Sequence, residues 1–445
     1  MQPSIKGAAL SGGLLLSISI FLLAVSPPAT SSFGVYNAQR IVEIAALALL
    51  NTLHPPRAFF CGLAGLALFF FFISGLISTI AATNPLWAGV EYVRVLLLFL
   101  LAIRIAYESE ITHEKHYQAL ALVASALAVK VSVGLYVINQ LGGGISALAD
   151  AFTNHRHFTE FFVAIESFFA FYLLSNSKSK AALLAILPLT LMSIVISIGA
   201  ARASALALCT SIFIYLAYCE KKKLSIGIVF IGVGLGQLIL GLTSFQSISQ
   251  SILRQQDSGR FQLWTIGIDY WKGNKIFGLG PMHFSSITND IAAHPHNIIV
   301  QLLCEWGLSG ALFIGIFFAI YYASFHRTNA IEIKKTLPAL ATITGLIASA
   351  MFGGVFVVPA VEFIFFILLG LSITPSLARW IKWGLMPIPV GICTLVLCTL
   401  TFLSWNWQAE DTPRGAPIDA PRFWQNGGIP PDVSPRPSML SEPRR

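Results

Sequence analysis

Charged side chains are scarce in this sequence. Only 11% of its 445 residues are Asp, Glu, Lys or Arg, whereas 56% are hydrophobic, and this balance excludes an ordinary soluble domain. Apolar runs of about 20 residues, long enough to cross a bilayer, recur along most of the chain instead. We therefore predict an all-α fold, a polytopic membrane bundle of about 12–13 transmembrane helices.

Several other features are also missing. The six cysteines (Cys61, Cys209, Cys219, Cys304, Cys393 and Cys398) lie in or beside apolar runs, which indicates packing residues and neither a disulfide framework nor a metal site. No glycine-rich nucleotide loop and no internal repeat occurs. The formal charge of +8 is accounted for by loops that orient the helices, so we predict no nucleic-acid partner and no cofactor.

The candidate spans follow from hydropathy alone. They cover 8–26, 36–53, 58–82, 86–106, 116–139, 157–175, 181–199, 201–219, 224–242, 297–325, 335–357, 360–375 and 380–403. The first run is followed by Ala-Val-Ser-Pro-Pro and could be a cleavable signal peptide, but we favour a retained helix.

The basic residues between the spans predict the orientation, because Lys and Arg accumulate on the cytoplasmic side. They fall on one side of the membrane: Lys6, Arg57, Lys178, Lys180, Lys221–Lys223, Arg327, Lys334, Lys335, Arg379 and Lys382. The opposite side then holds 27–35, 83–85, 140–156, the turn at 199–202, the long segment 243–296 and the tail. We expect chemistry on that second side.

Two regions are predicted by this pattern. Residues 1–403 form the transmembrane domain, and the Pro- and Arg-rich tail 404–445 is expected to be disordered. The long loop 243–296 carries aromatic and aliphatic residues at helical spacing, which predicts an amphipathic helix on the membrane surface. These residues are Phe261, Trp264, Ile268 and Trp271.

The segment His294-Pro295-His296-Asn297 ends that loop and opens an apolar helix. A helix N-terminus disfavours an imidazolium, so these histidines are biased toward the neutral form that a general base needs. Asn297, Gln301 and Glu305 then form one polar stripe that must face protein or water. Two other interpretations exist: ordinary interfacial histidines, and a metal site, which is disfavoured because Glu305 would lie on the opposite helix face, about 13 Å along the axis.

Two arginines on the same predicted side could bind an anion. Arg202 stands among small residues at an outer turn, where a forked, permanently charged donor could reach a diphosphate at the membrane surface. Snorkelling to the interface is the plainer interpretation. Arg260 precedes the amphipathic stretch and would sit at headgroup level, unless it is simply a solvated loop residue.

Polar residues also enter the sixth span from this side. Asn154, Arg156 and His157 could line a substrate path, or could reflect ordinary interfacial polarity. Charges within the spans, such as Glu91 with Arg94 and Glu43 with Arg40, are interpreted as structural pairs.

At this point the pattern is similar to a known family. His296-Asn297, with Gly307 and Gly310 further along, resembles the signature of bacterial O-antigen ligases. Arg202 before Leu206, Arg260 before Trp264 and the Ile276–Gly280 turn resemble the wider O-antigen ligase/polymerase superfamily. The resemblance covers about 150–320.

The resemblance implies a metal-independent, inverting glycosyl transfer at the periplasmic face of the bacterial inner membrane. The donor would be an undecaprenyl-diphosphate-linked glycan and the acceptor a hydroxyl of lipid A-core. By motif, His296 would be the base, and Arg202 and Arg260 would stabilise the diphosphate. His294, Asn297, Asn154, Arg156, His157 and Glu305 are the expected substrate-binding residues.

Other functions remain open. A polymerase and a protein O-oligosaccharyltransferase of the same superfamily share these residues, although no large extra soluble domain is present. A lipid-glycan transporter would place polar groups near mid-membrane between repeated halves, whereas the candidates here gather on one side.

Overall fold

The computed structural model of the chain describes residues 35–53, 62–141, 148–149, 152, 154–175, 179–243, 259–287, 289, 291–326, 328–373, 396 and 399. Twelve α-helices and no strand occur in this part of the chain, which confirms the all-α prediction. The predicted spans 8–26 and 380–403, apart from two isolated positions, and the tail 404–445 lie outside the described residues.

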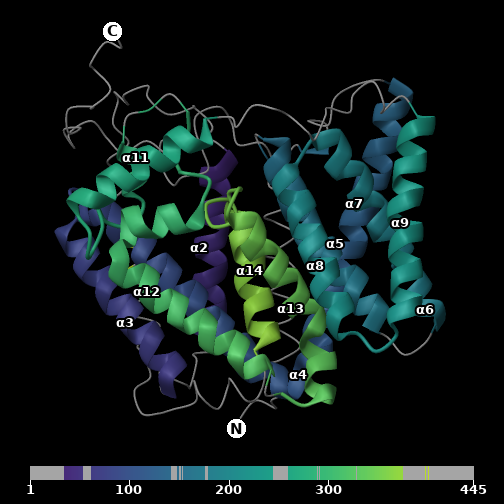
Figure 1. Ribbon diagram of the computed structural model, residues 1–445, viewed down its shortest axis with the longest axis horizontal. Coiled ribbons are helices and arrows are strands. Elements are labelled where there is room, and N and C mark those ends of the chain that lie inside the picture. The colour runs from purple at the N-terminus through teal and green to yellow at the C-terminus, as the bar shows by residue number, and fades with distance from the viewer. Residues whose placement is uncertain are drawn as a thin grey trace.

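The helices differ widely in length. In chain order they are α2 (Val35–Leu53), α3 (Gly62–Ala81), α4 (Pro85–Leu141), α5 (His155–Ser175), α6 (Ser179–Leu183), α7 (Ile186–Gly199), α8 (Arg202–Tyr218), α9 (Lys222–Leu242), α11 (Arg260–Gly273), α12 (Ile298–His326), α13 (Ala330–Ala350) and α14 (Pro359–Ser372), with a 3₁₀ turn η2 (His283–Ser286). Neighbours in space are often distant in sequence: α3 packs against α12, and α8 against α13 (Figure 1).

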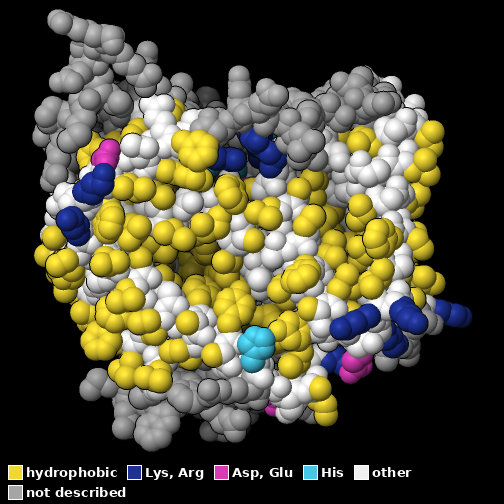
Figure 2. Space-filling model, in the orientation of Figure 1, with side chains coloured by type: hydrophobic (Ala, Val, Ile, Leu, Met, Phe, Trp, Pro, Cys, Tyr) yellow, Lys and Arg dark blue, Asp and Glu magenta, His cyan; other side chains and the backbone are white. Residues whose placement is uncertain are grey.

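Seven segments of the described chain are long and apolar enough to cross a membrane. Their outward faces are hydrophobic, as Phe230 on α9 illustrates with 76% of its surface exposed. Figure 2 shows a broad hydrophobic band, with Lys and Arg side chains toward its upper and lower margins. This distribution is typical of a multi-pass membrane protein.

The spans predicted at 86–106 and 116–139 agree with two of these segments, Pro85–Ala106 and Glu114–Leu141. Helical backbone continues through residues 107–115, so both belong to α4. That stretch contains Glu and Lys but neither Gly nor Pro, so its polarity resembles a loop while nothing in it breaks a helix.

A cluster of buried ion pairs ties α2, α4 and α14 together. Arg40 and Arg94 both contact Glu362, at 2.9 and 2.8 Å, and both contact Glu43. Arg94 also pairs with Glu91 at 2.6 Å. The predicted pairs are therefore confirmed, and they join in one network. Each charge has partners in it, as burial in an apolar bundle requires.

The helix α12 is broken at Gly307, whose φ of 72° and ψ of −177° are not helical. The segment before η2 inserts at this break, where Leu308 N–H donates to Lys275 O and Gly280 N–H donates to Glu305 O. A side chain on Gly307 would place Cβ 2.2 Å from Ile276 O. The sequence predicted a continuous helix with close helix packing at this glycine, and the close approach is made by a loop instead.

Candidate active site

The predicted outer end of the bundle contains a cavity of about 220 Å³. It is lined by the first residues of α5, α8 and α11, by the loop before α12 and by the turn between α13 and α14. Arg202 is the first residue of α8, Arg260 the first of α11, and His296 precedes α12. Three segments that are far apart in sequence thus bring the three predicted catalytic residues to one cavity.

Arg202 reaches the cavity because the chain reverses within two residues. After α7, Ala200 adopts a left-handed conformation (φ 44°), and Ala200 and Ala201 donate their N–H groups to Ser197 and Ile196. This arrangement closes the C-terminus of α7 in the manner of a Schellman turn. Small side chains at 200, 201 and 203 line the cavity and leave the guanidinium accessible.

Arg260 is positioned by the left-handed Gly259 (φ 76°), after which α11 begins. A helix forms over the predicted stretch, and its first residue, Arg260, lines the cavity while Phe261 is 65% exposed. Its amphipathic placement on the membrane surface stays a prediction. Trp264, one turn further on, donates a hydrogen bond from Nε1 to Pro295 O at 2.9 Å. The helix that carries Arg260 therefore also holds the loop that carries His296.

His296 has a left-handed backbone (φ 53°), which is uncommon for a residue other than glycine. Its N–H donates to His294 Nδ1 at 3.2 Å, and the two rings lie 4.0 Å apart. Asn297 caps α12 by accepting hydrogen bonds from Ile299 and Val300 N–H. These contacts fix the backbone on both sides of His296, which lines the cavity.

The electrostatic environment keeps His296 neutral. The pKa of His296 is lowered from 6.5 to about 4, mainly by burial and in addition by the positive charges of Arg260 and Arg156. An imidazole that is neutral at pH 7 has a free lone pair, which is the form that accepts a proton. The bias predicted from the helix N-terminus has the same direction, but the two arginines are a cause that the sequence did not reveal.

The start of α5 supplies the remaining predicted residues of the cavity. Asn154 caps the helix by accepting a hydrogen bond from Arg156 N–H at 2.9 Å, and Arg156 and His157 follow in the first turn. His157 lies close enough to His296 for an electrostatic interaction. The three residues of this predicted path therefore lie in the cavity.

Helix N-termini and arginines together make the cavity an anion site. The amino ends of α5, α8 and α11 converge there, and α12 begins two residues after His296. No side chain caps α8 or α11. Positive helix dipoles and three lining arginines (Arg156, Arg202 and Arg260) outweigh the single lining carboxylate, Glu160.

A comparison with protein families agrees with this geometry. Residues 167–315 match the family described as O-antigen ligase. The matched segment contains Arg202, Arg260 and His296, as well as Gly307 and Gly310. This match supports a member of the O-antigen ligase/polymerase superfamily. Together with the seven apolar helices, it supports a membrane glycosyl-transfer enzyme of the ligase or polymerase type. No match was found among curated proteins.

The cavity residues at the start of α5 (154–160) and on the α13–α14 turn lie outside the segment matched to the O-antigen ligase family. Glu160 is the one that our sequence reasoning missed. It is buried, lines the cavity, accepts a hydrogen bond from Gly354 N–H, and interacts electrostatically with Arg260 and Arg156. Its position, one turn after Arg156 on a capped helix, was the available signal.

Gly353 makes room for that carboxylate. A Cβ at this position would lie 2.4 Å from Glu160 Oε1. Gly353 and Gly354 belong to the turn between α13 and α14, and Gly354 O accepts hydrogen bonds from Val357 and Val358 N–H. Arg40 of the buried ion-pair cluster donates to Val357 O at 2.9 Å. The cluster in the core thus supports one wall of the cavity.

Three predicted substrate-binding residues do not line the cavity. His294 is buried and supports His296, and Asn297 caps α12. Glu305 lies lower in α12, 1% exposed, where it accepts hydrogen bonds from Phe284 N–H and Gln301 Nε2. Among the described residues no group of three or more potential metal ligands occurs.

A largely apolar cavity of about 360 Å³, with Glu91 and Glu362 also in its wall, has some lining residues that follow those of the charged cavity in the sequence. Its lining includes Ile298 and Leu302 at the start of α12 and Phe356 beyond the Gly353–Gly354 turn. His296 and Ile298 therefore separate a charged compartment from an apolar one within three residues.

Proposed function

We propose that the chain transfers a glycan from undecaprenyl diphosphate to a hydroxyl of lipid A-core oligosaccharide at the periplasmic face of the inner membrane. The observation that carries the proposal is the single cavity lined by Arg202, Arg260 and His296, with converging helix N-termini around it. Such a site suits a diphosphate, and its neutral imidazole suits a hydroxyl acceptor.

The reaction uses each group once. The acceptor oxygen attacks the anomeric carbon from the face opposite the diphosphate, the bond to the diphosphate oxygen breaks, and the configuration inverts. His296 takes the proton of the acceptor hydroxyl. Arg202 and Arg260, with Arg156 beside them, stabilise the negative charge that grows on the leaving diphosphate. A diphosphate leaves readily, so these residues suffice and the mechanism is independent of a metal.

The two cavities, whose linings are neighbours in the sequence at His296 and Ile298, suit the two parts of the donor. The charged cavity takes the diphosphate and the first sugar, while the apolar cavity beyond Ile298 is of the right chemistry for isoprenoid units near the diphosphate. Asn154, His157 and Glu160 at the cavity wall are placed to contact hydroxyls of the sugars.

A polymerase remains the second candidate, because a glycan on a second lipid carrier can also present the attacking hydroxyl. Lipopolysaccharide gels of a deletion strain, complemented with the wild type or with His296→Ala, separate the two. A ligase defect leaves bare core and lipid-linked polymer, whereas a polymerase defect leaves core with a single repeat. Full complementation by His296→Ala would reject the proposed base.

A further inference from the structure

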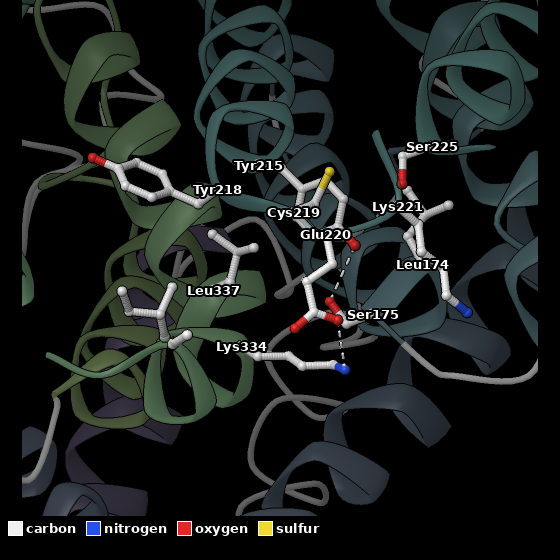
Figure 3. A pocket seen from close by; sticks show the side chains of 12 residues that line it. Leu174, Ser175, Tyr215, Tyr218, Cys219, Glu220, Lys221, Ser225, Lys334 and Leu337 are labelled. Carbon is white, nitrogen blue, oxygen red and sulfur yellow. Dashed lines mark hydrogen bonds and ion pairs between the residues drawn. The ribbon is translucent and has the colours of Figure 1, made fainter. Parts of the chain in front are cut away.

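A second pocket lies at the opposite end of α5 and α8, in the region shown in Figure 3. It has a volume of about 130 Å³ and lies between the ends of α5 and α8 and the beginnings of α9 and α13. Since α8 runs from Arg202 in the cavity to Tyr218 in this pocket, about 25 Å of helix separates the two sites. The predicted orientation puts the pocket at the cytoplasmic leaflet.

Hydroxyl groups form one wall of the pocket. Ser175 Oγ and Tyr215 Oη are 3.1 Å apart, and Ser225 on α9 is 1% exposed. Ser175 and Tyr215 hydrogen-bond to each other, so one proton of this pair is used and the other hydroxyl can donate to an incoming acceptor. Figure 3 shows Ser175, Tyr215 and Ser225 with Lys221 and Lys334 around the same space.

The charge of the pocket is positive. Lys221 and Lys334 line it, and Lys334 pairs with Glu220 at 3.0 Å. The α9 helix begins at Lys222 without a side-chain cap, so the positive end of its dipole faces this region. Among the described residues, Glu220 is the only acid that lines the pocket.

Apolar side chains complete the pocket and continue outside it. Leu174, Ile333 and Leu337 line it beside the polar groups. The next residues of α9 present hydrophobic side chains outward, with Leu224 37% and Ile226 39% exposed. A ligand for this place has an anionic oxygen group at one end and hydrocarbon at the other.

We infer that this pocket binds the phosphate group of an anionic phospholipid. Lys221 and Lys334 would make charge-assisted hydrogen bonds to the phosphodiester oxygens, the hydroxyls would add neutral ones, and the acyl chains would lie along α9. A zwitterionic phospholipid carries its own ammonium group, which the surrounding lysines repel. The inference does not depend on the glycosyl-transfer reaction.

The test uses the purified full-length protein in neutral detergent, with native mass spectrometry titrations of phosphatidylglycerol and phosphatidylcholine. We expect phosphatidylglycerol to bind more tightly. The double variant Lys221→Gln/Lys334→Gln should weaken its binding roughly tenfold, because two charged donors are lost. The matched control, Lys222→Gln/Lys223→Gln, removes the same charge from residues that do not line the pocket, and it should bind within about twofold of wild type.

Several results would overturn the inference. One is equal binding of the two lipids, and another is an equal loss of phosphatidylglycerol binding in the control variant. A third is complete displacement of phosphatidylglycerol by millimolar inorganic phosphate, which would indicate a site for a soluble anion. Melting curves of both variants establish that they fold. Transfer activity is not the readout, so a failed active-site proposal and a failed lipid site are distinguishable.

Discussion

His296 owes its chemistry to its surroundings. The hydrogen bond to His294 and the Trp264 contact to Pro295 hold its left-handed backbone at the cavity, and burial together with two arginines lowers the pKa and keeps the imidazole neutral. The sequence predicted a neutral histidine at this helix start. It could not predict that Arg156 would lie nearby, because α5 and the loop before α12 meet only through the tertiary fold.

The pH dependence of transfer tests the state of His296. Because the pKa of His296 is lowered to about 4, the base stays neutral through neutral and mildly acidic pH. We expect kcat/KM for the donor to be flat from about pH 8 to about pH 5 and to fall at lower pH as the imidazole is protonated. An acid limb at or above pH 6.5, with the protein still folded by circular dichroism, would contradict this environment.

Glu160 tests the electrostatic balance of the cavity. Glu160→Gln keeps an acceptor for Gly354 N–H but removes the negative charge beside Arg156 and Arg260. We therefore expect the KM for the donor diphosphate to fall about threefold to tenfold at low ionic strength, with kcat changed less. Loss of kcat at unchanged KM would instead give Glu160 a part in the chemical step.

Gly353→Ala provides the complementary change. The new Cβ would collide with Glu160 Oε1 at 2.4 Å and displace the carboxylate. If the carboxylate acts through its position near the arginines, this variant should alter donor KM as well. An unchanged KM in both variants would show that Glu160 does not influence donor binding.

Among the helices, α12 is broken at Gly307, a glycine of the family pattern, and a loop packs against its backbone there. Gly307→Ala should destabilise the protein by about 3 kcal/mol or more, since the backbone is left-handed and Cβ meets Ile276 O at 2.2 Å. Gly315→Ala in the same helix has open space around Cβ and should be neutral or slightly stabilising. Equal melting temperatures for the two variants would contradict this account.

Most helices could be predicted from hydropathy, because each apolar run has the length of a span. The short helices and the merged α4 could not, since the end of a helix depends on capping and packing as well as on polarity. The insertion of residues 274–280 into α12 was also hidden. Gly278 and Gly307 marked the place in the sequence, but only the fold shows that their backbones touch.

Across the whole molecule, the two ends of the helix bundle carry different sites. The cavity with its arginines lies at one end of α8, and the lysine-lined pocket lies at the other. The sequence predicted this separation. When successive spans alternate in direction, the loops rich in Lys and Arg all fall on one side of the membrane. The side of each end in the cell is still a prediction.

Labelling with a membrane-impermeant maleimide tests the orientation. In a background without cysteine, a cysteine at Lys272 on the exposed face of α11 should react in cells whose outer membrane is permeabilised, and a cysteine at Lys223 should not. Both should react after complete lysis, which serves as the control. The reverse pattern would place the cavity in the cytoplasm and remove the proposed acceptor.

The most direct measurement is transfer by the purified protein, supplied with an undecaprenyl-diphosphate-linked glycan and lipid A-core in detergent without added metal. The account predicts glycan attached to the core by the wild type. It predicts a loss of about 10²-fold or more for His296→Ala and for Arg202→Ala or Arg260→Ala, with each variant folded. Wild-type turnover in folded His296→Ala protein would contradict the central claim.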